Sequence, residues 1–493
     1  MAYQQRVPGG ARRHRVAAAS GPSVAPPASA GGRCTVERVL SARNRELFGL
    51  LPAALLVVGG FTAIFVQQQS DSTAASSNLT LHHASSVSLT YGAIFLGLCV
   101  IMHLVIRVTL PHADPYMFPL AAVLASVGIV MIYRINPTLA RQQAQWMVLG
   151  LGLFAITILW LRRAGLGVLE RYRYTIALVG IGLTILPRFP GIGQQVNGAY
   201  LNIHIGSVAF QPAELAKIAI VIFIASYLRD NRQLLVTGGR RVLGVTIPPM
   251  KQFGPLLVVW GASMATLLVT RELGTSLMFF GAFLALLYVA TGRLSFPIVG
   301  LILFGLGAWF VSKHVGHVEQ RVLAWEHPLN TTLYNEQGGS YQLAQSMFAQ
   351  ADGGLLGTGL HQSVLEVPIQ LANGTVVQRP LVPVPESDLI YAVLTDELGL
   401  VGAAGLLGVY LLFIWRWMKT ATLARDSFSK LLATGLSFII ALQVFVIVGG
   451  VTDLIPLTGV TLPLVAYGGS SVVMNFVLLA LLLIISERAR RPQ

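Results

Sequence analysis

The chain has 493 residues, of which 54% are hydrophobic and only 11% are charged, and its mean hydropathy is +0.68. This composition excludes an ordinary soluble domain and indicates a protein that is surrounded by lipid. The formal net charge of +14 does not indicate nucleic-acid binding, because the basic residues are scattered between apolar runs and form no basic face. With only Cys34 and Cys99, the chain cannot build a disulfide framework or a CxxC metal site.

The first segment, residues 1–45, is rich in Ala, Gly, Pro, Ser and Arg, which predicts a disordered basic tail. Long apolar runs follow, and each can cross a bilayer as a helix that satisfies its own backbone hydrogen bonds. They begin near Leu47, Ser88, Pro115, Ala144, Tyr174, Phe210, Phe253, Leu273, Leu294, Asp388, Leu431 and Thr461. The sequence therefore predicts an all-α polytopic membrane protein of about twelve transmembrane helices, with two helices in residues 46–114, the others in residues 115–488, and a short tail at 489–493.

The connections between these runs differ in charge and in length. Most of the Lys and Arg residues fall in alternate connections, on the same side as the basic tail, and the positive-inside tendency places that side in the cytoplasm. Both termini are therefore expected to be cytoplasmic. On the opposite side, residues 314–387 form one outsized connection, and long loops of this kind are functional or disordered.

The sixth predicted span opens with an ionisable pair, Glu214 and Lys217, three residues apart on one helix face. Ionisable groups inside a membrane normally face a cavity or a partner, and they are candidates for a functional site. The alternative is a salt bridge that neutralises itself and fixes the packing of the helices. The sequence leaves both interpretations open.

A tight turn at Arg271 connects the seventh and eighth predicted spans, and its structural interpretation is a charged hairpin tip. In the functional interpretation, Arg271 joins Lys217, Arg321 and Arg379 in offering positive charge to a phosphate-bearing ligand.

Asp388 lies where the large external loop enters the tenth predicted span. It can serve as a helix N-cap, or as a general base whose pKa is raised by partial desolvation. About 12 Å deeper, at 1.5 Å rise per residue, Asp396 and Glu397 indicate a polar cavity or an ion pair with a buried Arg or Lys. Pro and Gly breaks at 456–463 and 467–471 are explained equally by close helix packing and by a cavity.

Several segments of the chain, in this order, resemble the SEDS family of bacterial shape, elongation, division and sporulation proteins, which includes RodA, FtsW and SpoVE. The matching segments are Pro190–Gly193, Asn197–Ala199, Gln211–Lys217, Glu272–Thr275, Tyr341–Ser346, Gly353–Gly359, Pro385–Asp388, Glu397–Gly399, Pro456–Gly459 and Tyr467–Ser471. The chain differs from the usual family pattern at 200–202, 270–272 and 386–389. The two extra N-terminal spans are similar to the actinobacterial, RodA-like branch.

The resemblance implies a bundle of transmembrane helices with a large extracytoplasmic loop, and a peptidoglycan glycosyltransferase that polymerises lipid II at the outer face of the cytoplasmic membrane. It also implies a class B penicillin-binding protein as the transpeptidase partner. The family's essential aspartate corresponds to Asp388. We expect Asp388 to be catalytic and a divalent cation such as Mg²⁺ to be a candidate cofactor. The candidates for substrate binding are Glu214, Lys217, Arg271, Arg321, Arg379, Gln345, Ser346 and Glu397.

In the mechanism that we expect, Asp388 accepts the proton of an acceptor 4-hydroxyl as this attacks the anomeric carbon of the donor, with inversion. Positive charge from basic side chains or a divalent ion stabilises the leaving diphosphate. Two alternatives stay open. A flippase for the lipid-linked precursor would use the intramembrane charges along a transport path, and a non-catalytic scaffold would only recruit the partner enzyme.

Overall fold

The computed structural model describes residues 30–73, 81–189, 191–196, 199–205, 208–237, 240–242, 245–247, 250–270, 273–336, 338–370 and 376–492. The chain divides into two compact units, Met1–Ser41 and Ala42–Gln493. In the first unit the described residues, 30–41, begin helix α1 (Ala30–Gly49). The predicted disorder of residues 1–45 is therefore wrong from Ala30 onward, and residues 1–29 lie outside the described part.

The second unit is built almost entirely of helices. They are α2 (Leu51–Thr73), α3 (Leu81–Thr109), α4 (Met117–Ile135), α5 (Pro137–Ala164), α6 (Gly167–Arg171), α7 (Arg173–Ile185), α8 (Pro212–Thr237), α9 (Met250–Thr270), α10 (Leu273–Thr291), α11 (Ser295–His314), α12 (Gly316–Glu326), α13 (Thr331–Asn335), α14 (Tyr341–Gly353), α15 (Ile390–Leu423), α16 (Ser427–Val451) and α17 (Gly469–Arg490), with a 3₁₀ turn at Leu186–Arg188. The prediction of an all-α membrane protein is confirmed.

The strands are short, antiparallel and confined to connections. β1 (Gly193–Val196), β2 (Ala199–Ile205) and β3 (Val208–Phe210) form one sheet in chain order. Two hairpins pair β4 (Arg240–Val242) with β5 (Val245–Ile247), and β6 (Glu366–Gln370) with β7 (Val376–Pro380).

Among the described residues, nine helical segments are long and apolar enough to cross a membrane. They are Leu40–Gln67, Thr90–Thr109, Met117–Ile135, Pro137–Ala164, Gly274–Thr291, Ser295–His314, Ile390–Leu423, Ser427–Val451 and Gly469–Arg490. The three other predicted spans correspond to α7, α8 and α9. Of these, α7 has only 13 residues, α8 carries charged residues near both ends, and the apolar part of α9 that could be searched is Phe253–Ala262.

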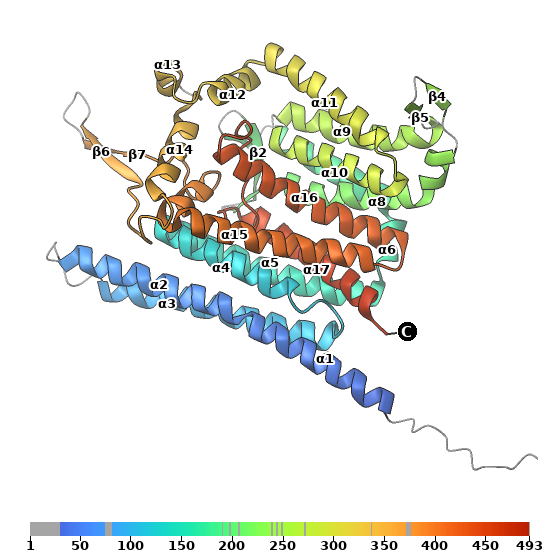
Figure 1. The fold of residues 1–493 in the computed structure, drawn as a ribbon, viewed down its shortest axis with the longest axis horizontal. Coiled ribbons are helices and arrows are strands. Elements are labelled where there is room, and N and C mark those ends of the chain that lie inside the picture. Colours follow the sequence, from blue (N-terminus) through green and yellow to red (C-terminus); the bar gives the residue numbers. More distant parts are fainter. Residues whose placement is uncertain are drawn as a thin grey trace, which may run out of the picture. The chain divides into compact units, whose positions relative to one another are not determined.

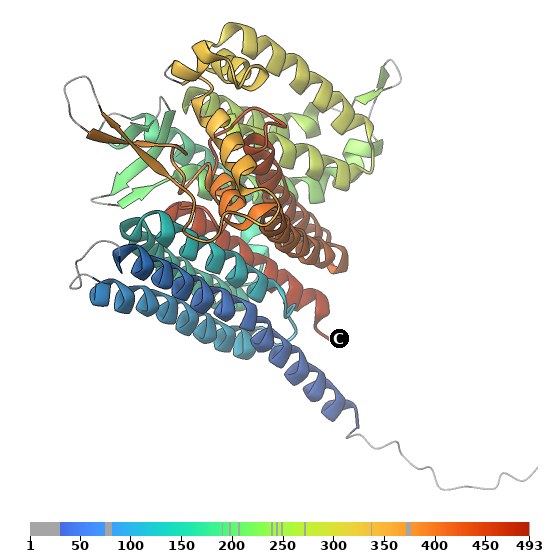
Figure 2. The same ribbon diagram turned by 60° about the vertical axis from the view of Figure 1, so that its left-hand side comes forward.

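The helices of the second unit pack as a bundle in which segments far apart in sequence are neighbours. Helix α17 packs against α5, α15 packs against α16, and α8 packs against α7, α10 and α16 (Figures 1 and 2). Helices α2 and α3 run along α4 and α5, whereas α11 buries none of its residues. Helices α12, α13 and α14 gather at one end of the bundle, so much of the described part of the predicted large loop is helical (Figure 1).

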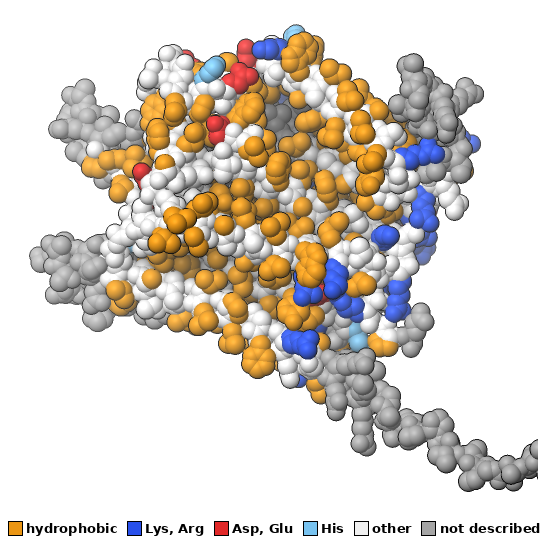
Figure 3. Space-filling view, viewed as in Figure 1, with side chains coloured by type: hydrophobic (Ala, Val, Ile, Leu, Met, Phe, Trp, Pro, Cys, Tyr) orange, Lys and Arg blue, Asp and Glu red, His pale blue; other side chains and the backbone are white. Residues whose placement is uncertain are grey.

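Charge is distributed unevenly between the two ends of this bundle. On the face shown in Figure 3, most Lys and Arg side chains gather where α6 and the end of α17 lie, and Asp and Glu side chains lie mainly over α12, α13 and α14. We call the first of these the basic end and the second the loop end. This asymmetry in space corresponds to the uneven distribution of Lys and Arg among the connections of the sequence.

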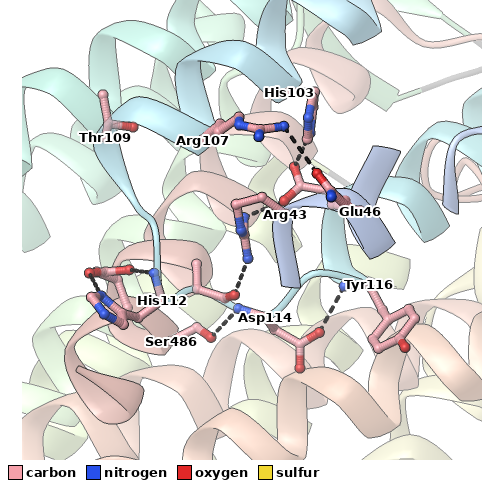
Figure 4. Close-up of polar contacts among 12 residues, drawn as sticks. Arg43, Glu46, His103, Arg107, Thr109, His112, Asp114, Tyr116 and Ser486 are labelled. Carbon is pink, nitrogen blue, oxygen red and sulfur yellow. Dashed lines mark hydrogen bonds and ion pairs between the residues drawn. The ribbon is translucent and has the colours of Figure 1, made fainter. Parts of the chain in front are cut away.

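A buried ion-pair network attaches the N-terminal helices to the core at the basic end (Figure 4). Arg43 pairs with Glu46 one turn later and donates to the carbonyl of Ala113, in the connection from α3 to α4. His103 Nδ1 of α3 lies 3.2 Å from Glu46 Oε1. Since Arg43 and Glu46 are buried, the helix around them is stabilised by tertiary contacts that local composition does not reveal.

The same connection is tied to the C-terminal helices (Figure 4). The Asp114 carboxylate accepts from Arg490 of α17 at 2.7 Å and from Arg416 of α15 at 3.5 Å, and the Ser486 hydroxyl accepts from the Asp114 backbone N–H. These bonds join the connection between α3 and α4 to α15 and α17.

Candidate active site

Asp388 stands at the mouth of α15, at the loop end. The helix begins at Ile390, and its N-cap, Leu389, makes no side-chain capping bond. The hydrogen bond described for the Asp388 carboxylate is a long one, 3.4 Å, from the Ser387 hydroxyl to Oδ1. Asp388 is therefore not an N-cap in the structure, and its carboxylate is available to another partner.

Arg321 of α12 shares a small space with Asp388. A side-chain carbon added at Gly459 would lie 3.6 Å from Asp388 Oδ2 and 3.8 Å from Arg321 Nη2. Gly459 has a φ of +70°, a conformation that favours glycine, so the gap between the two charged groups is kept open. Arg321 Nη1 also donates to the Leu457 carbonyl at 3.1 Å, which fixes the guanidinium beside the carboxylate.

The surroundings of Asp388 change its proton affinity. Burial raises the pKa of Asp388 from 3.8 to about 6; the Arg321 charge and the Ser387 hydroxyl oppose this rise, and the Glu386 charge adds to it. Burial lowers the pKa of Arg321, and the Asp388 charge partly restores it. A carboxylate with a pKa near 6 is ionised at neutral pH and still basic enough to accept a proton during a reaction.

The loop between α16 and α17, Thr452–Gly468, carries this site, and we call it the α16–α17 loop. The Trp325 indole of α12 donates to the Asp453 carbonyl at 3.0 Å. The Tyr467 backbone N–H donates to the Glu386 carbonyl at 2.8 Å, and just before Glu386 the β-branched Val384 has a φ of +48°. Such strained backbone persists where its surroundings fix it, and here it precedes the segment that presents Asp388.

Glu214 and Lys217 form the buried pair that the sequence left open. Their charged groups are 2.8 Å apart, with side chains 4% and 6% exposed. Lys217 Nζ donates to Gln443 Oε1 at 3.1 Å, and Gln443 Nε2 donates to the Thr461 carbonyl of the α16–α17 loop at 2.7 Å. A cavity of about 10 Å³ beside the pair has room for about one water molecule. The pair is therefore linked through Gln443 to the α16–α17 loop. Its predicted binding to substrate stays a prediction.

Glu397 forms the internal ion pair that was the alternative to a polar cavity. Arg134 Nε of α4 lies 2.6 Å from Glu397 Oε1, with side chains 8% and 0% exposed. The Ser363 hydroxyl donates to the same oxygen at 2.8 Å, and Arg134 Nη2 donates to the Ser363 carbonyl. This arrangement joins α4, α15 and the segment after α14, and substrate binding by Glu397 stays a prediction.

The glycine-rich segment 353–359 fits against a break in α15. Gly399 has a φ of +67° inside the helix, and its neighbours bond to this segment: Thr358 N–H donates to Asp396 O and Leu400 N–H donates to Gly354 O. A side-chain carbon at Gly399 would come within 2.3 Å of Gly357 N. The glycines are required by close backbone packing.

Gln345 and Ser346 belong to α14 and make internal contacts. Gln345 Nε2 donates to the Tyr334 hydroxyl at 2.6 Å, and the buried Ser346 hydroxyl lies 3.1 Å from the Val451 carbonyl at the end of α16. Arg271 lies outside the described residues, and Arg379 lies in β7 with a side chain outside the described part. Of the proposed basic contacts, the structure thus brings Arg321 to Asp388 and places Lys217 in a buried pair.

Three residues of this region carry roles that the sequence did not assign: Gln443, Glu386 and Trp325. Gln443 had a detectable signal, because an amide inside an otherwise apolar span needs a buried partner. Glu386 and Trp325 had none, since their contacts depend on how the α16–α17 loop folds over α12. Among the described residues, no group of three or more His, Cys, Asp or Glu could hold a metal ion by itself.

Comparison with known proteins finds relatives that match most of the chain. A family model described as "Cell cycle protein", for FtsW, RodA and SpoVE, matches residues 112–491. The peptidoglycan glycosyltransferase RodA of Mycobacterium tuberculosis is 38% identical over 465 residues, covering 91% of this chain and 92% of its own length. Stage V sporulation protein E of Bacillus subtilis is 28% identical over 378 residues, covering 74% of this chain and 95% of its own.

Solved structures share the fold. A chain from a study of the structural coordination of polymerization and crosslinking by a peptidoglycan synthase complex has a TM-score of 0.60 at 23% identity, over 77% of this chain and 99% of its own. The rod shape determining protein RodA of Thermus thermophilus has a TM-score of 0.52 at 22% identity, over 77% and 98%. At these identities the likeness concerns the arrangement of the helices.

Proposed function

We infer the function from the family, because this chain belongs to the FtsW, RodA and SpoVE family of cell cycle proteins. It is a multi-pass membrane protein, and it is a peptidoglycan glycosyltransferase, the activity for which its curated relatives are named. The single observation in the structure that supports this chemistry is Asp388, a carboxylate with a pKa of about 6 that faces Arg321 across Gly459 at the loop end.

The proposed reaction joins two lipid-linked sugars of the lipid II class. As the 4-hydroxyl oxygen of the acceptor attacks the anomeric carbon of the donor, its proton passes to the Asp388 carboxylate. The bond from the anomeric carbon to the diphosphate oxygen breaks, and the configuration at that carbon inverts. General-base catalysis supplies roughly 10²- to 10⁴-fold, so the site must also stabilise the departing charge.

Arg321 is the described cation placed for this second task. Its guanidinium is held by the Leu457 carbonyl beside the space that Gly459 leaves open. Negative charge develops on the leaving diphosphate in the transition state, and a positioned guanidinium binds such oxygens in a bidentate manner. Arg321 would therefore assist departure of the leaving group while it keeps Asp388 ionised.

A divalent cation is a further part of the proposal. Mg²⁺ is commonly bound by one or two carboxylates together with substrate phosphates, and Asp388 and Glu386 are two neighbouring carboxylates whose charges interact at this site. This donor set fits an ion that takes its remaining ligands from the diphosphate and water. When bound, such an ion would add positive charge at the leaving group.

We place the loop end outside the cytoplasmic membrane and both termini in the cytoplasm. The gathering of Lys and Arg at the other end supports this orientation, because cytoplasmic segments carry an excess of these residues. A class B penicillin-binding protein is the proposed partner, and the link between polymerization and crosslinking that is described for the structural neighbour supports it.

The proposal is tested by gel-resolved polymerisation of labelled lipid II with purified wild-type protein and Asp388→Asn, each with and without the candidate transpeptidase. The matched control is Glu319→Gln, which removes an exposed carboxylate from α12, two residues before Arg321. We expect polymer from wild type and control and none from Asp388→Asn, with all three proteins equally monodisperse. Equal polymer from Asp388→Asn would remove this residue from the mechanism.

The same experiment distinguishes the alternatives. If no protein forms polymer with or without the partner, a flippase or a scaffold becomes the better explanation. The structure weakens the argument for transport, because Glu214, Lys217 and Glu397, which would have lined the path, are engaged in buried ion pairs.

A further inference from the structure

A polar cleft of about 550 Å³ opens at the basic end, at the opposite end of the bundle from the Asp388 site. Its charged lining residues are Glu170, Arg229, Asp230, Arg232, Asp426 and Arg488. The cleft lies where membrane spans begin and end. Helix α5 ends at Ala164, two residues before Leu166, which lines the cleft. Helix α16 begins at Ser427, and α17 ends at Arg490. This is the level of lipid head groups.

The three acids of the cleft already have partners. Glu170 pairs with Arg229, and Asp230 pairs with Arg229 at 3.4 Å and also with Arg173. Asp426 caps α16 by accepting from the Ser429 N–H at 2.8 Å. The charges of Glu170 and Asp230 are therefore balanced by arginines, and the Asp426 carboxylate is stabilised by the start of α16.

Two guanidinium groups remain. Arg232 of α8 and Arg488 of α17 are exposed, and the structure describes no ion pair or hydrogen bond for either side chain. Arg488 Nη2 would lie 3.4 Å from a side-chain carbon added at Gly165, the residue that caps α5 with a φ of +79°. Because no described acid pairs with Arg232 or Arg488, both guanidinium groups are available to an anionic ligand.

We propose that this cleft binds the phosphate-bearing head group of an anionic phospholipid. Arginine binds phosphate oxygens in a planar, bidentate manner, and basic pockets between membrane helices favour anionic lipids. A soluble phosphate would use the same two arginines. The lipid is favoured because the cleft lies at the ends of spans and because Leu234, next to the lining residue Gln233, is 48% exposed and can contact an acyl chain.

Native mass spectrometry of the detergent-purified full chain tests this proposal, with phosphatidylglycerol titrated against phosphatidylcholine. Wild type is expected to retain phosphatidylglycerol in preference. Arg232→Gln combined with Arg488→Gln is expected to weaken that binding roughly 30-fold, the effect of two basic residues near a lipid surface. The matched control, Arg163→Gln with Lys419→Gln, removes two exposed charges from the same end but outside the cleft lining, and should change it less than twofold.

Thermal unfolding of each variant without added lipid establishes that the folds are equally stable. Equal affinity of wild type and the cleft variant for phosphatidylglycerol would overturn the proposal, as would an equal loss in the control variant. A further titration with glycerol 1-phosphate identifies the source of the phosphate. If the soluble compound displaces the lipid at equal concentration, the natural ligand is a soluble phosphate and the lipid is rejected.

Discussion

Two acids on the same stretch of chain, Asp388 and Glu397, experience opposite surroundings. Glu397 is fully buried, lies 2.6 Å from the Arg134 guanidinium and accepts a second bond from Ser363. For Asp388 the structure describes one long hydrogen bond, from Ser387, and the guanidinium of the nearby Arg321 donates to the α16–α17 loop. Close pairing makes an intramembrane charge part of the scaffold, whereas incomplete pairing at the mouth of a helix keeps a charge available for chemistry.

The contrast between the two acids is tested most directly by neutralising each of them in turn. Asp388→Asn should lower the rate of glycan polymerisation by roughly 10²- to 10⁴-fold, because the amide cannot accept the acceptor proton. Its thermal unfolding should match that of wild type, since the carboxylate makes little internal contact. Rates come from time courses of labelled lipid II consumption. A stable protein with an unchanged rate would show that Asp388 is not the base.

Glu397→Gln should have the opposite profile. Removing one partner of a buried ion pair leaves the Arg134 charge uncompensated, at a cost of about 3 to 5 kcal/mol in stability. The rate per folded molecule should stay close to that of wild type. Thermal unfolding in detergent measures the loss, and Arg134→Gln combined with Glu397→Gln is the control, because it removes both charges and should recover part of the stability. A fully stable single variant with a large loss of rate would make Glu397 a functional residue.

The sequence was informative wherever a feature is local. Apolar runs predicted the helical membrane fold, and the position of Asp388 between a long loop and an apolar run predicted an acid at a helix mouth. The sequence also named the ion-pair alternative for Glu214 with Lys217 and for Glu397, but it could not choose, because the partners Gln443 and Arg134 come from distant helices.

Two other outcomes depended on tertiary structure alone. The helix at Arg43 and Glu46 is buried by α3 and the connection after it, so tail-like composition was misleading there. The proximity of Arg321 to Asp388 depends on the left-handed Gly459 and on α12 docking over the α16–α17 loop. Neither contact leaves a periodic signal in the sequence.

Arg321→Gln tests the surroundings of Asp388, because it removes the cation that partly balances the charge of this carboxylate. The positive charge favours the ionised carboxylate, so its loss should raise the pKa of Asp388 above about 6. The active form of a general base is the ionised one, and the acid limb of the profile of kcat/KM against pH should therefore move to higher pH. Arg321→Lys, which keeps the charge, is the control. An unmoved limb in Arg321→Gln, with the control also unmoved, would show that the two groups are not coupled.

The smallest expected shift in the acid limb comes from Glu386→Gln, measured without an added divalent cation. The Glu386 charge raises the pKa of Asp388, and it is the weakest of the influences on this group. Its removal should therefore move the acid limb of kcat/KM to lower pH, opposite in direction to Arg321→Gln and smaller in size. The backbone bond from Tyr467 to the Glu386 carbonyl does not involve the side chain, so the loop should stay in place and unfolding should be unchanged. A shift to higher pH in Glu386→Gln would mean that the ionisation seen in the profile does not belong to Asp388, and the contrast between the two acids would then need another explanation.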